Sequence, residues 1–303
     1  MMRHFWVSIL LSFMAGTSAV QAETSTLGIN VSGVDRTYRL YVPAAVRTPG
    51  AVVIALHGNM GTAERLEKSM AWGKVAEREG FAVVYPQGID NAWNDGRPAY
   101  RKLNKRARPG DDVPFLNALA DKLIADKIAQ PGRIYLMGVS NGGFMAMRMA
   151  CEASAKFAGF APVIASAPVE YETGCRWPDA FPILVMGGTA DTFIQWQGNS
   201  ALGILPLPKL AGLVAAANGC NAFVTDTLPD FVPDDGSTVT ATSWRGCKTG
   251  GAVSLYAVMG GGHLPPAKEA ERSSFLVRKM LGSQNHDIDA AETIWAFFKA
   301  NMR

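Results

Sequence analysis

The sequence has few metal-ligand residues and little net charge. Its 303 residues include four histidines and four cysteines, and its formal net charge is +3. The cysteines form no CxxC pair and the histidines are too few to replace them, so we expect no metal site. A charge this close to zero provides no general attraction for nucleic acid or anionic lipid. Repeats, linkers and low-complexity tracts that would divide the chain are also missing.

The overall composition is that of a soluble globular protein. Hydrophobic residues make up 48% of the chain and charged residues 18%, which is enough apolar material for one large core. We therefore expect one domain, or at most two, and assign residues 23–303 to a single catalytic domain. The oligomeric state is not predictable from the sequence.

The first 22 residues differ from the rest. Arg3 and His4 precede the apolar run FWVSILLSFMAG, and Val20 and Ala22 are the small residues that signal peptidases accept. We predict a signal peptide, residues 1–22, cleaved after Ala22, and hence a secreted or periplasmic protein that leaves the membrane after cleavage. A membrane anchor is the alternative, but the apolar run is short for a span. The mature chain keeps 28 basic and 26 acidic side chains.

All four cysteines lie after the predicted cleavage site, at Cys151, Cys175, Cys220 and Cys247. An even number of cysteines in an exported chain predicts two disulfides, for which three pairings are possible. Partners that are neighbours in sequence would close loops of about 25 residues, each worth about 3 kcal/mol in the chain-entropy model.

Short apolar runs and helical patterns alternate along the mature chain. The predicted strands are TYRLYVP (37–43), AVVIAL (51–56), FAVVY (81–85), RIYLMG (133–138), FAPVIASA (160–167), FPILVMG (181–187) and VSLYAV (253–258). Helical spacing is found over 62–79, 111–129 and the last amphipathic segment, 289–302. Continuously apolar strands are typical of a parallel sheet buried on both faces. The sequence thus predicts an α/β fold, a three-layer sandwich with a mostly parallel sheet, in which residues 195–247 form a cap or loop excursion before the last core strand.

The segment GVSNG places Ser140 at the end of a predicted strand and the start of a helix. It matches G-x-S-x-G, a sharp strand-to-helix turn in which small neighbours let the serine hydroxyl stand clear of the backbone. A tight turn with a capping serine is the alternative. We interpret Ser140 as a nucleophile at the carboxyl edge of the sheet, where reactive groups of parallel sheets gather.

A nucleophilic serine needs a base and a carboxylate that orients the base. His263 follows the strand VSLYAV in the flexible loop MGGGHLPP, and Asp191 follows FPILVMG. The order Ser140, Asp191, His263 is the order of α/β-hydrolases. His286 is interpreted as a surface residue and His57 as a structural one. The competing acids lie before their strand or in the 195–247 segment: Asp179, Asp226, Asp230, Asp234 and Asp235.

The oxyanion of a tetrahedral intermediate needs two N–H donors. The amide of Asn141 follows the nucleophile at a helix N-terminus, where the helix dipole favours negative charge. The second donor is expected in the Gly-rich loop HGNMG after AVVIAL, at Asn59, with Met60 as the second choice.

With these residues assigned, the chain resembles the polyhydroxybutyrate depolymerase and feruloyl esterase group of α/β-hydrolases, similar to carbohydrate esterase family one. The matching segments are YRLYVP, LHGNMGTAE, VVYPQG, DDVPFL, GVSNGGFMAMRMAC, GTAD, NGC, WRGC, GGGH and IWAFF, which cover most of the mature chain. The resemblance implies a serine esterase with Ser140, Asp191 and His263 as its triad, without metal or organic cofactor. It also implies a disulfide between Cys220 and Cys247, and spacing favours Cys151 with Cys175.

The substrate is less defined than the chemistry. Members of this group often have an aromatic residue and proline after the histidine, whereas this sequence has Leu264. Two aromatic residues are candidate substrate contacts: Trp93, in the basic loop with Arg97, and Trp196, beside the acid; core packing is the alternative for both. The expected substrates are small or oligomeric esters, either hydroxyalkanoate oligomers or feruloyl and acetyl esters. A serine peptidase and an exported non-catalytic binding protein are the alternative functions.

Overall fold

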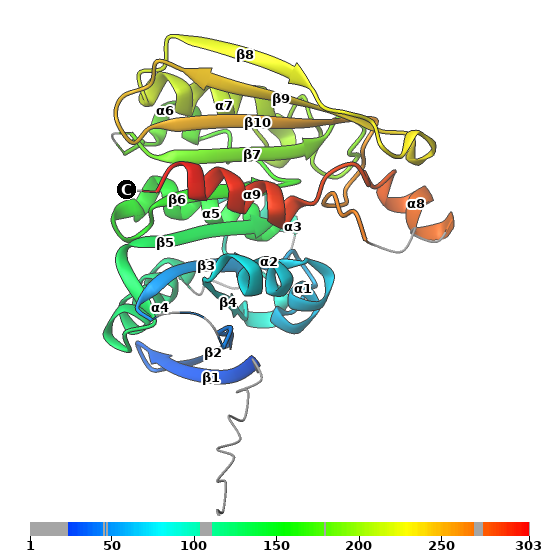
Figure 1. The fold of residues 1–303 in the computed structure, drawn as a ribbon. Coiled ribbons are helices and arrows are strands. Elements are labelled where there is room, and N and C mark those ends of the chain that lie inside the picture. The colour runs from blue at the N-terminus through cyan, green and yellow to red at the C-terminus, as the bar shows by residue number, and fades with distance from the viewer. Residues whose placement is uncertain are drawn as a thin grey trace, which may run out of the picture.

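The computed structural model describes residues 24–302, apart from residues 45, 47, 104–110, 179 and 270–274 (Figure 1). The predicted signal peptide, residues 1–22, lies outside the described residues. Among the helices of the described part, none is long and apolar enough to cross a membrane.

A ten-stranded mixed sheet forms the centre of the molecule, in the order β1-β2-β4-β3-β5-β6-β7-β10-β9-β8. The strands are β1 (Thr24–Val31), β2 (Val34–Tyr41), β3 (Gly50–Leu56), β4 (Ala82–Pro86), β5 (Ala129–Val139), β6 (Gly159–Val163), β7 (Pro182–Gly188), β8 (Ala222–Thr227), β9 (Thr238–Arg245) and β10 (Ala252–Met259). The run from β4 to β10 is parallel, and the strands at the two edges pair antiparallel. The carboxyl ends of the parallel strands lie at the right in Figure 1.

Helices cover both faces of this sheet. The helices are α1 (Ala63–Ser69), α2 (Trp72–Glu79), α3 (Pro98–Leu103), α4 (Asp112–Ala125), α5 (Asn141–Glu152), α6 (Tyr171–Gly174), α7 (Leu207–Ala217), α8 (Phe275–Leu281) and α9 (Ala290–Ala300), with short 3₁₀ turns η1 (Ile89–Asn91), η2 (Ser154–Lys156), η3 (Ser200–Leu202) and η4 (Pro233–Asp235). One apolar cluster joins the sheet to α1, α2 and α9, and a second joins the other face to α4, α5 and α7. The predicted three-layer α/β sandwich is confirmed.

The strand β3 shows why the predicted strands are continuously apolar. Val52, Ile54 and Leu56 pack in the cluster with α4 and α5, whereas Val53 and Ala55 pack in the cluster with α1 and α2. Alternate side chains of a strand point to opposite faces, and here both faces are covered. Every residue of β3 after Gly50 is therefore buried.

The helical pattern over 62–79 is interrupted in the structure. Thr62 caps α1 by accepting a hydrogen bond from the amide of Arg65, but the chain turns extended at Met70, with φ −119° and ψ 140°, before α2 begins at Trp72. Each helix presents its own apolar residues to the sheet, so the hydrophobic periodicity continues through the break. The break leaves a recess at this edge of the molecule that periodicity does not predict.

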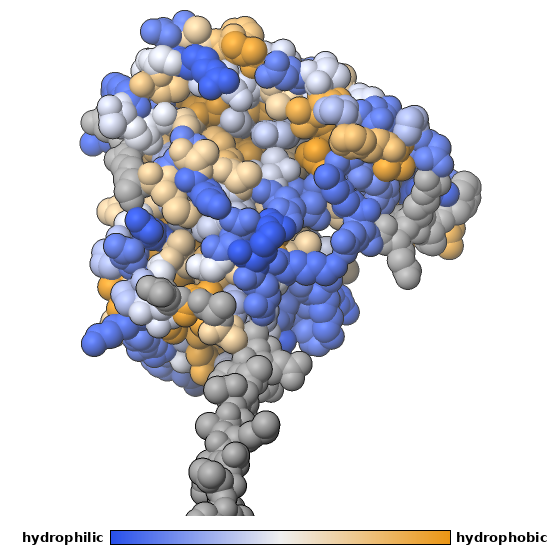
Figure 2. Space-filling view, in the orientation of Figure 1, coloured by the Kyte–Doolittle hydropathy of each residue, from blue (hydrophilic) through white to orange (hydrophobic). Residues whose placement is uncertain are grey.

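Residues 195–247 require a correction of the expected cap or loop excursion. Helix α7 packs against β7 and β10, as a crossover helix does, and β8 and β9 extend the sheet beyond β10 as an antiparallel hairpin. The alternating exposure of β9, for example buried Val239 and half-exposed Thr240, belongs to a sheet with one covered face. Figure 2 shows hydrophobic surface along the upper edge, over β8, and a hydrophilic band over α1 and α2.

Both expected disulfides are present. Cys151, at the end of α5, is bonded to Cys175, which follows α6, and Cys220 is bonded to Cys247 across the base of the β8–β9 hairpin. The two bonds join cysteines 24 and 27 residues apart, so each closes a short loop of the chain.

Candidate active site

Ser140 lies at the sharp turn between β5 and α5. Its backbone has φ 52° and ψ −119°, a strained conformation for a residue with a side chain. The turn is held by the amide of Ser140, which donates to the carbonyl of Val163, and by the carbonyl of Ser140, which accepts from the amides of Gly143 and Phe144. The structure therefore contains the strand-to-helix turn expected of G-x-S-x-G.

The glycines around Ser140 are required by close backbone contacts. A Cβ atom on Gly138 would lie 2.1 Å from the carbonyl oxygen of Gly142, and one on Gly142 would lie 2.5 Å from the carbonyl oxygens of Leu56 and His57. A Cβ atom on Gly143 would lie 2.4 Å from that of Ala165. No side chain fits at these three positions, because the first turn of α5 packs directly on the ends of β3 and β6.

A continuous chain of hydrogen bonds joins the three predicted site residues. Nε2 of His263 is 3.0 Å from Oγ of Ser140, and Nδ1 of His263 is 2.7 Å from Oδ2 of Asp191. The residues come from the carboxyl ends of β5, β7 and β10, which meet at one edge of the parallel sheet. The His263 side chain is 14% exposed and that of Asp191 is 1% exposed, so the pair is shielded while the serine remains accessible from outside.

Asp191 and His263 are both held in place by backbone groups. Oδ1 of Asp191 accepts hydrogen bonds from the amides of Phe193, at 2.8 Å, and Ile194, at 2.9 Å, which leaves Oδ2 for the imidazole. The amide of His263 donates to the carbonyl of Leu281, at the end of α8. Because backbone hydrogen bonds hold both Asp191 and His263, the fold itself sets the orientation of the imidazole.

An aromatic ring that the sequence analysis missed lies against His263. The Phe193 ring is centred 5.2 Å from the imidazole at an interplanar angle of 34°, and Phe193 is 48% exposed. Leu264 occupies the position where members of the resembled group often have an aromatic residue, and here the ring comes from the loop after Asp191. Its position two residues after Asp191 was the available signal.

The other histidines have structural hydrogen bonds. His57 is 1% exposed; its Nδ1 donates to the carbonyl of Gly58, and its Nε2 accepts from the amide of Gly88. Burial lowers the pKa of His57, which keeps the ring neutral. His286 is half-buried rather than a surface residue, because its ring meets the carbonyl of Ala267 and its amide donates to Asp235.

The competing acids are elsewhere. Asp235 binds backbone and side-chain groups of Ser237 and the amide of His286, and Asp226 is exposed on β8. Asp179 lies outside the described residues. In the described part of the chain, no group of three or more histidine, cysteine, aspartate or glutamate side chains is arranged to hold a metal ion.

The two predicted oxyanion donors lie on neighbouring backbone segments. The amide of Asn141 is in the first turn of α5, where amides have no carbonyl partner one turn earlier in the helix. In the loop after β3, the amide of Met60 donates to the carbonyl of Asn91 at 2.8 Å, which removes the second-choice donor in this structure. Asn59 therefore stays the candidate in that loop.

Trp93 is a structural residue, which corrects its assignment as a substrate contact. Its side chain is fully buried, and its indole Nε1 donates to the carbonyl of His57 at 2.8 Å. The Trp93 amide donates to Oδ1 of Asn141, and the Trp93 carbonyl accepts from Nδ2 of Asn141. Nδ2 of Asn141 also donates to Asp95 at 2.6 Å. Core packing was the alternative interpretation of Trp93, but its link to Asn141 was not predicted, because it is a contact between residues far apart in the chain.

Arg97, from the same basic loop, also lies inside the protein. It is 3% exposed, forms an ion pair with the fully buried Asp95, and its guanidinium lies over the rings of Phe144 and Tyr100. A buried guanidinium needs such partners to offset its lost hydration. Among the remaining basic residues of this loop, Lys102 is exposed, and Lys105, Arg106 and Arg108 lie outside the described residues.

Trp196 is half-buried beside Gly187, where it packs against the cluster that contains α7. Its carbonyl accepts a hydrogen bond from the amide of Leu207 at the start of α7. Both interpretations of its side chain, core packing and substrate contact, are compatible with this position.

A strained serine hydrogen-bonded to a histidine and a buried aspartate, at the carboxyl edge of a mostly parallel sheet, is the arrangement typical of the α/β-hydrolase fold. Residues 36–172 match the family model "Esterase PHB depolymerase", which belongs to the group that the sequence resembles. The matched region contains Ser140, whereas Asp191 and His263 lie beyond it.

Curated relatives extend the similarity to most of the chain. The protein named "Putative esterase NocK" from Nocardia uniformis subsp. tsuyamanensis is 29% identical over 292 residues, which are 90% of this chain and 81% of that protein. Feruloyl esterase B from Neurospora crassa is 31% identical over 163 residues, which are 51% of this chain and 54% of that protein. The chain thus spans about half of the second relative's length.

The solved structure of acetyl xylan esterase from Aspergillus awamori has the same fold. Its TM-score is 0.57 at 16% sequence identity, and the match covers 79% of this chain and 94% of that one. Relatives and structural neighbours are carboxylic ester hydrolases, which is the class predicted for this chain.

Proposed function

We propose that the chain is a serine esterase that hydrolyses carboxylic esters through an acyl-enzyme. The observation that carries this proposal is the hydrogen-bonded sequence Ser140–His263–Asp191, with separations of 3.0 and 2.7 Å. A serine hydroxyl is a weak nucleophile at neutral pH, and an oriented imidazole is the group that activates it.

In the first half of the reaction, Nε2 of His263 accepts the proton of Ser140 while Oγ attacks the ester carbonyl. The amides of Asn141 and Asn59 stabilise the negative oxygen of the tetrahedral intermediate. The protonated His263 then donates its proton to the departing alkoxide, and the alcohol leaves. Asp191 keeps Nδ1 of His263 protonated and stabilises the transient imidazolium.

In the second half, His263 accepts a proton from water, and the hydroxide attacks the acyl group on Ser140. Collapse of the second intermediate releases the carboxylic acid and returns the proton to Ser140. These steps balance without a metal or an organic cofactor.

The proposed substrates are hydroxyalkanoate oligomers or feruloyl and acetyl esters, and the proposed location is the periplasm or the cell exterior. The names of the relatives support this range of substrates. Two disulfides and the N-terminal signal-peptide pattern support export. Trp196 is proposed to line the site, and Trp196→Ala should then raise KM for bulky aromatic esters.

The test is hydrolysis of p-nitrophenyl acetate, methyl ferulate and a hydroxybutyrate oligomer by the chain expressed in an oxidising compartment. Ser140→Ala should abolish turnover of each accepted substrate, and Asp191→Asn should reduce it by about four orders of magnitude, the loss seen when the imidazole takes the wrong tautomer. Near-full activity of Asp191→Asn would contradict the role of that residue.

Fluorophosphonate labelling separates the esterase from a non-catalytic binding protein. Labelling of the wild type that disappears in Ser140→Ala supports the proposal. An unlabelled wild type, without turnover of any ester, would favour the binding protein, and cleavage of peptides in preference to esters would favour a peptidase.

A further inference from the structure

Two hollows with lining residues in common lie between the α1–α2 break and the loop that follows His263. The inner hollow has a volume of about 210 Å³ and the outer one about 340 Å³. They share the lining residues Ser69, Met70, Ala71, Ala267 and Asp289. Figure 2 shows the surface hollowed between the part that carries α1 and α2 and the arm that leads to α8.

The inner hollow is lined by residues that are next to the reacting residues in the chain. Val139, which lines it, immediately precedes Ser140, and Leu264, which also lines it, immediately follows His263. The same extended backbone at Met70 and Ala71 that separates α1 from α2 forms its opposite wall. The wall of this hollow thus includes the chain neighbours of two reacting residues, on the face of the sheet covered by α1, α2 and α9.

The lining of the inner hollow is predominantly aliphatic. Apart from Ser69, Gln284 and Asp289, its walls are hydrocarbon side chains: Leu66, Met70, Ala71, Val139, Leu264, Pro265, Pro266, Ala267 and Ala291. Asp289 caps α9 by accepting from the amide of Glu292, and burial raises its pKa. Such a surface gains free energy when a hydrocarbon chain displaces water from it.

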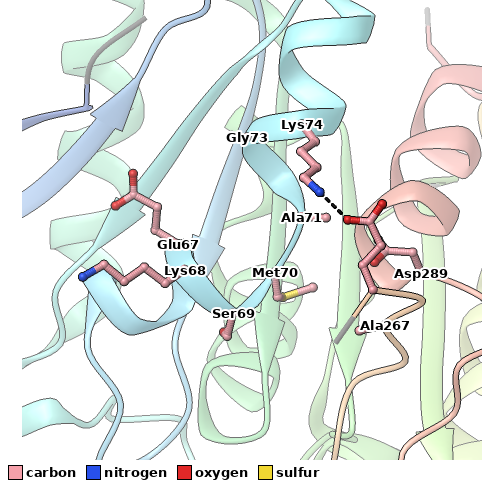
Figure 3. Close-up of a pocket in the computed structure, with 10 residues that line it drawn as sticks. Glu67, Lys68, Ser69, Met70, Ala71, Gly73, Lys74, Ala267 and Asp289 are labelled. Carbon is pink, nitrogen blue, oxygen red and sulfur yellow. Dashed lines mark hydrogen bonds and ion pairs between the residues drawn. The ribbon is translucent and has the colours of Figure 1, made fainter. Parts of the chain in front are cut away.

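The outer hollow is charged, which sets a limit to the apolar region. Lys74, from α2, forms an ion pair with Glu269, from the loop after His263, and Glu67 and Lys68 line the same space. Figure 3 shows Lys74 reaching across the hollow above Met70 and Ala71, opposite Asp289 and Ala267. Covering these charges with hydrocarbon would remove their hydration without replacing it.

We propose that the inner hollow binds the acyl part of the ester, an aliphatic chain longer than acetyl, and that the charged outer hollow receives the chain's polar or hydrated end. This inference rests on the proposed esterase function and adds the identity of the acyl pocket. The site thus selects acyl groups by length, and the Lys74–Glu269 pair marks the end of the apolar pocket.

The test is the acyl-chain profile of kcat/KM for p-nitrophenyl acetate, butanoate, hexanoate and octanoate. In the wild type, kcat/KM should rise about fourfold for each methylene that enters the pocket, and level off when the chain reaches the charged part. Ala71→Phe places a ring in the hollow and should lower kcat/KM for the octanoate roughly tenfold or more, while the acetate changes by less than about threefold. The matched control is Ala222→Phe, the same change on exposed β8, which should keep the wild-type profile.

A second variant tests the inference independently in case Ala71→Phe does not fold. Ala267→Leu narrows the hollow from the opposite wall and should shorten the preferred chain in the same way. If both variants hydrolyse acetate and keep the wild-type profile, the acyl-pocket inference is overturned while the esterase function stands. If the wild type shows no Ser140-dependent turnover of acetate or any longer ester, the proposed function fails, and the inference fails with it.

Discussion

The indole Nε1 of Trp93 donates a hydrogen bond to the carbonyl of His57, while the backbone of Trp93 binds the side chain of Asn141 through two further hydrogen bonds. One buried residue thus connects the loop after β3 to the first turn of α5. These two segments carry the amides of Asn59 and Asn141, the proposed oxyanion donors. The separation of those donors therefore depends on Trp93, which itself cannot contact a substrate.

Trp93→Phe should lower kcat about tenfold and leave KM nearly unchanged. The phenyl ring keeps most of the packing, but the carbonyl of His57 loses its buried donor, a cost of about 1–3 kcal/mol in stability or in distortion of the loop. Misplaced donors weaken binding of the transition state more than binding of the ester. Steady-state kinetics at a temperature well below Tm measures the split. An unchanged kcat with a lower Tm would show that the hydrogen bond serves stability alone.

Gly142→Ala should prevent formation of an active enzyme. The added Cβ would lie 2.5 Å from two backbone carbonyl oxygens, which cannot move without shifting β3 or α5. The matched control is Gly212→Ala in α7, where a Cβ meets nothing within 4 Å and alanine should stabilise the helix by up to about 1 kcal/mol. Soluble yield, Tm and fluorophosphonate labelling distinguish the two. A folded, labelled Gly142→Ala protein would contradict the close packing of the turn.

Phe193→Ala should raise KM for apolar and aromatic esters severalfold and change kcat little. The ring is half-exposed against His263, so it offers apolar surface at the mouth of the site, while its amide continues to bind Asp191 in the variant. Comparison of methyl ferulate with p-nitrophenyl acetate measures the effect, and Phe193→Leu should restore much of it. If each substrate has the same KM in the wild type and in Phe193→Ala, a contact between Phe193 and the substrate is excluded.

The wild-type protein should lose stability as the pH falls below about 6.5 through protonation of His57. Burial lowers the pKa of His57 in the folded state from its ordinary value of 6.5, so the unfolded chain binds the proton more readily. The stability that depends on a neutral ring is complete above that value and decreases as the pH falls toward the folded-state pKa. The difference in Tm between the wild type and His57→Gln should therefore shrink as the pH is lowered from 8 to 5. If the two Tm values change with pH in parallel, protonation of His57 is not the cause of the loss of stability.

The sequence predicts the parts of this protein that depend on local pattern. The parallel strands follow from apolar runs buried on both faces, and Ser140, Asp191 and His263 follow from their positions after three such runs. The break at Met70 escapes prediction because α1 and α2 keep the same apolar periodicity on either side of it. Core packing was one of the two interpretations of Trp93, but its partner and the burial of Arg97 are not predictable, for a different reason. Their partners, Asn141 and Phe144, lie more than 40 positions away, and charge and aromaticity alone suggest a surface loop.

The hydrogen bond from the amide of His263 to the carbonyl of Leu281 has a consequence for the order in which the candidate site is assembled. A chain emerging from the ribosome or from a translocation pore contains its serine long before the segment that fixes its histidine. The amide of Gly262 likewise donates to the carbonyl of Ser283. The loop that carries His263 therefore lacks both hydrogen-bond partners until α8 and the turn after it have been synthesised. A polypeptide that ends before Leu281 possesses all three residues of the triad and still lacks the support for its base. The hydrogen-bond partners of the loop that carries His263 thus lie in a segment that follows all three candidate site residues in the chain.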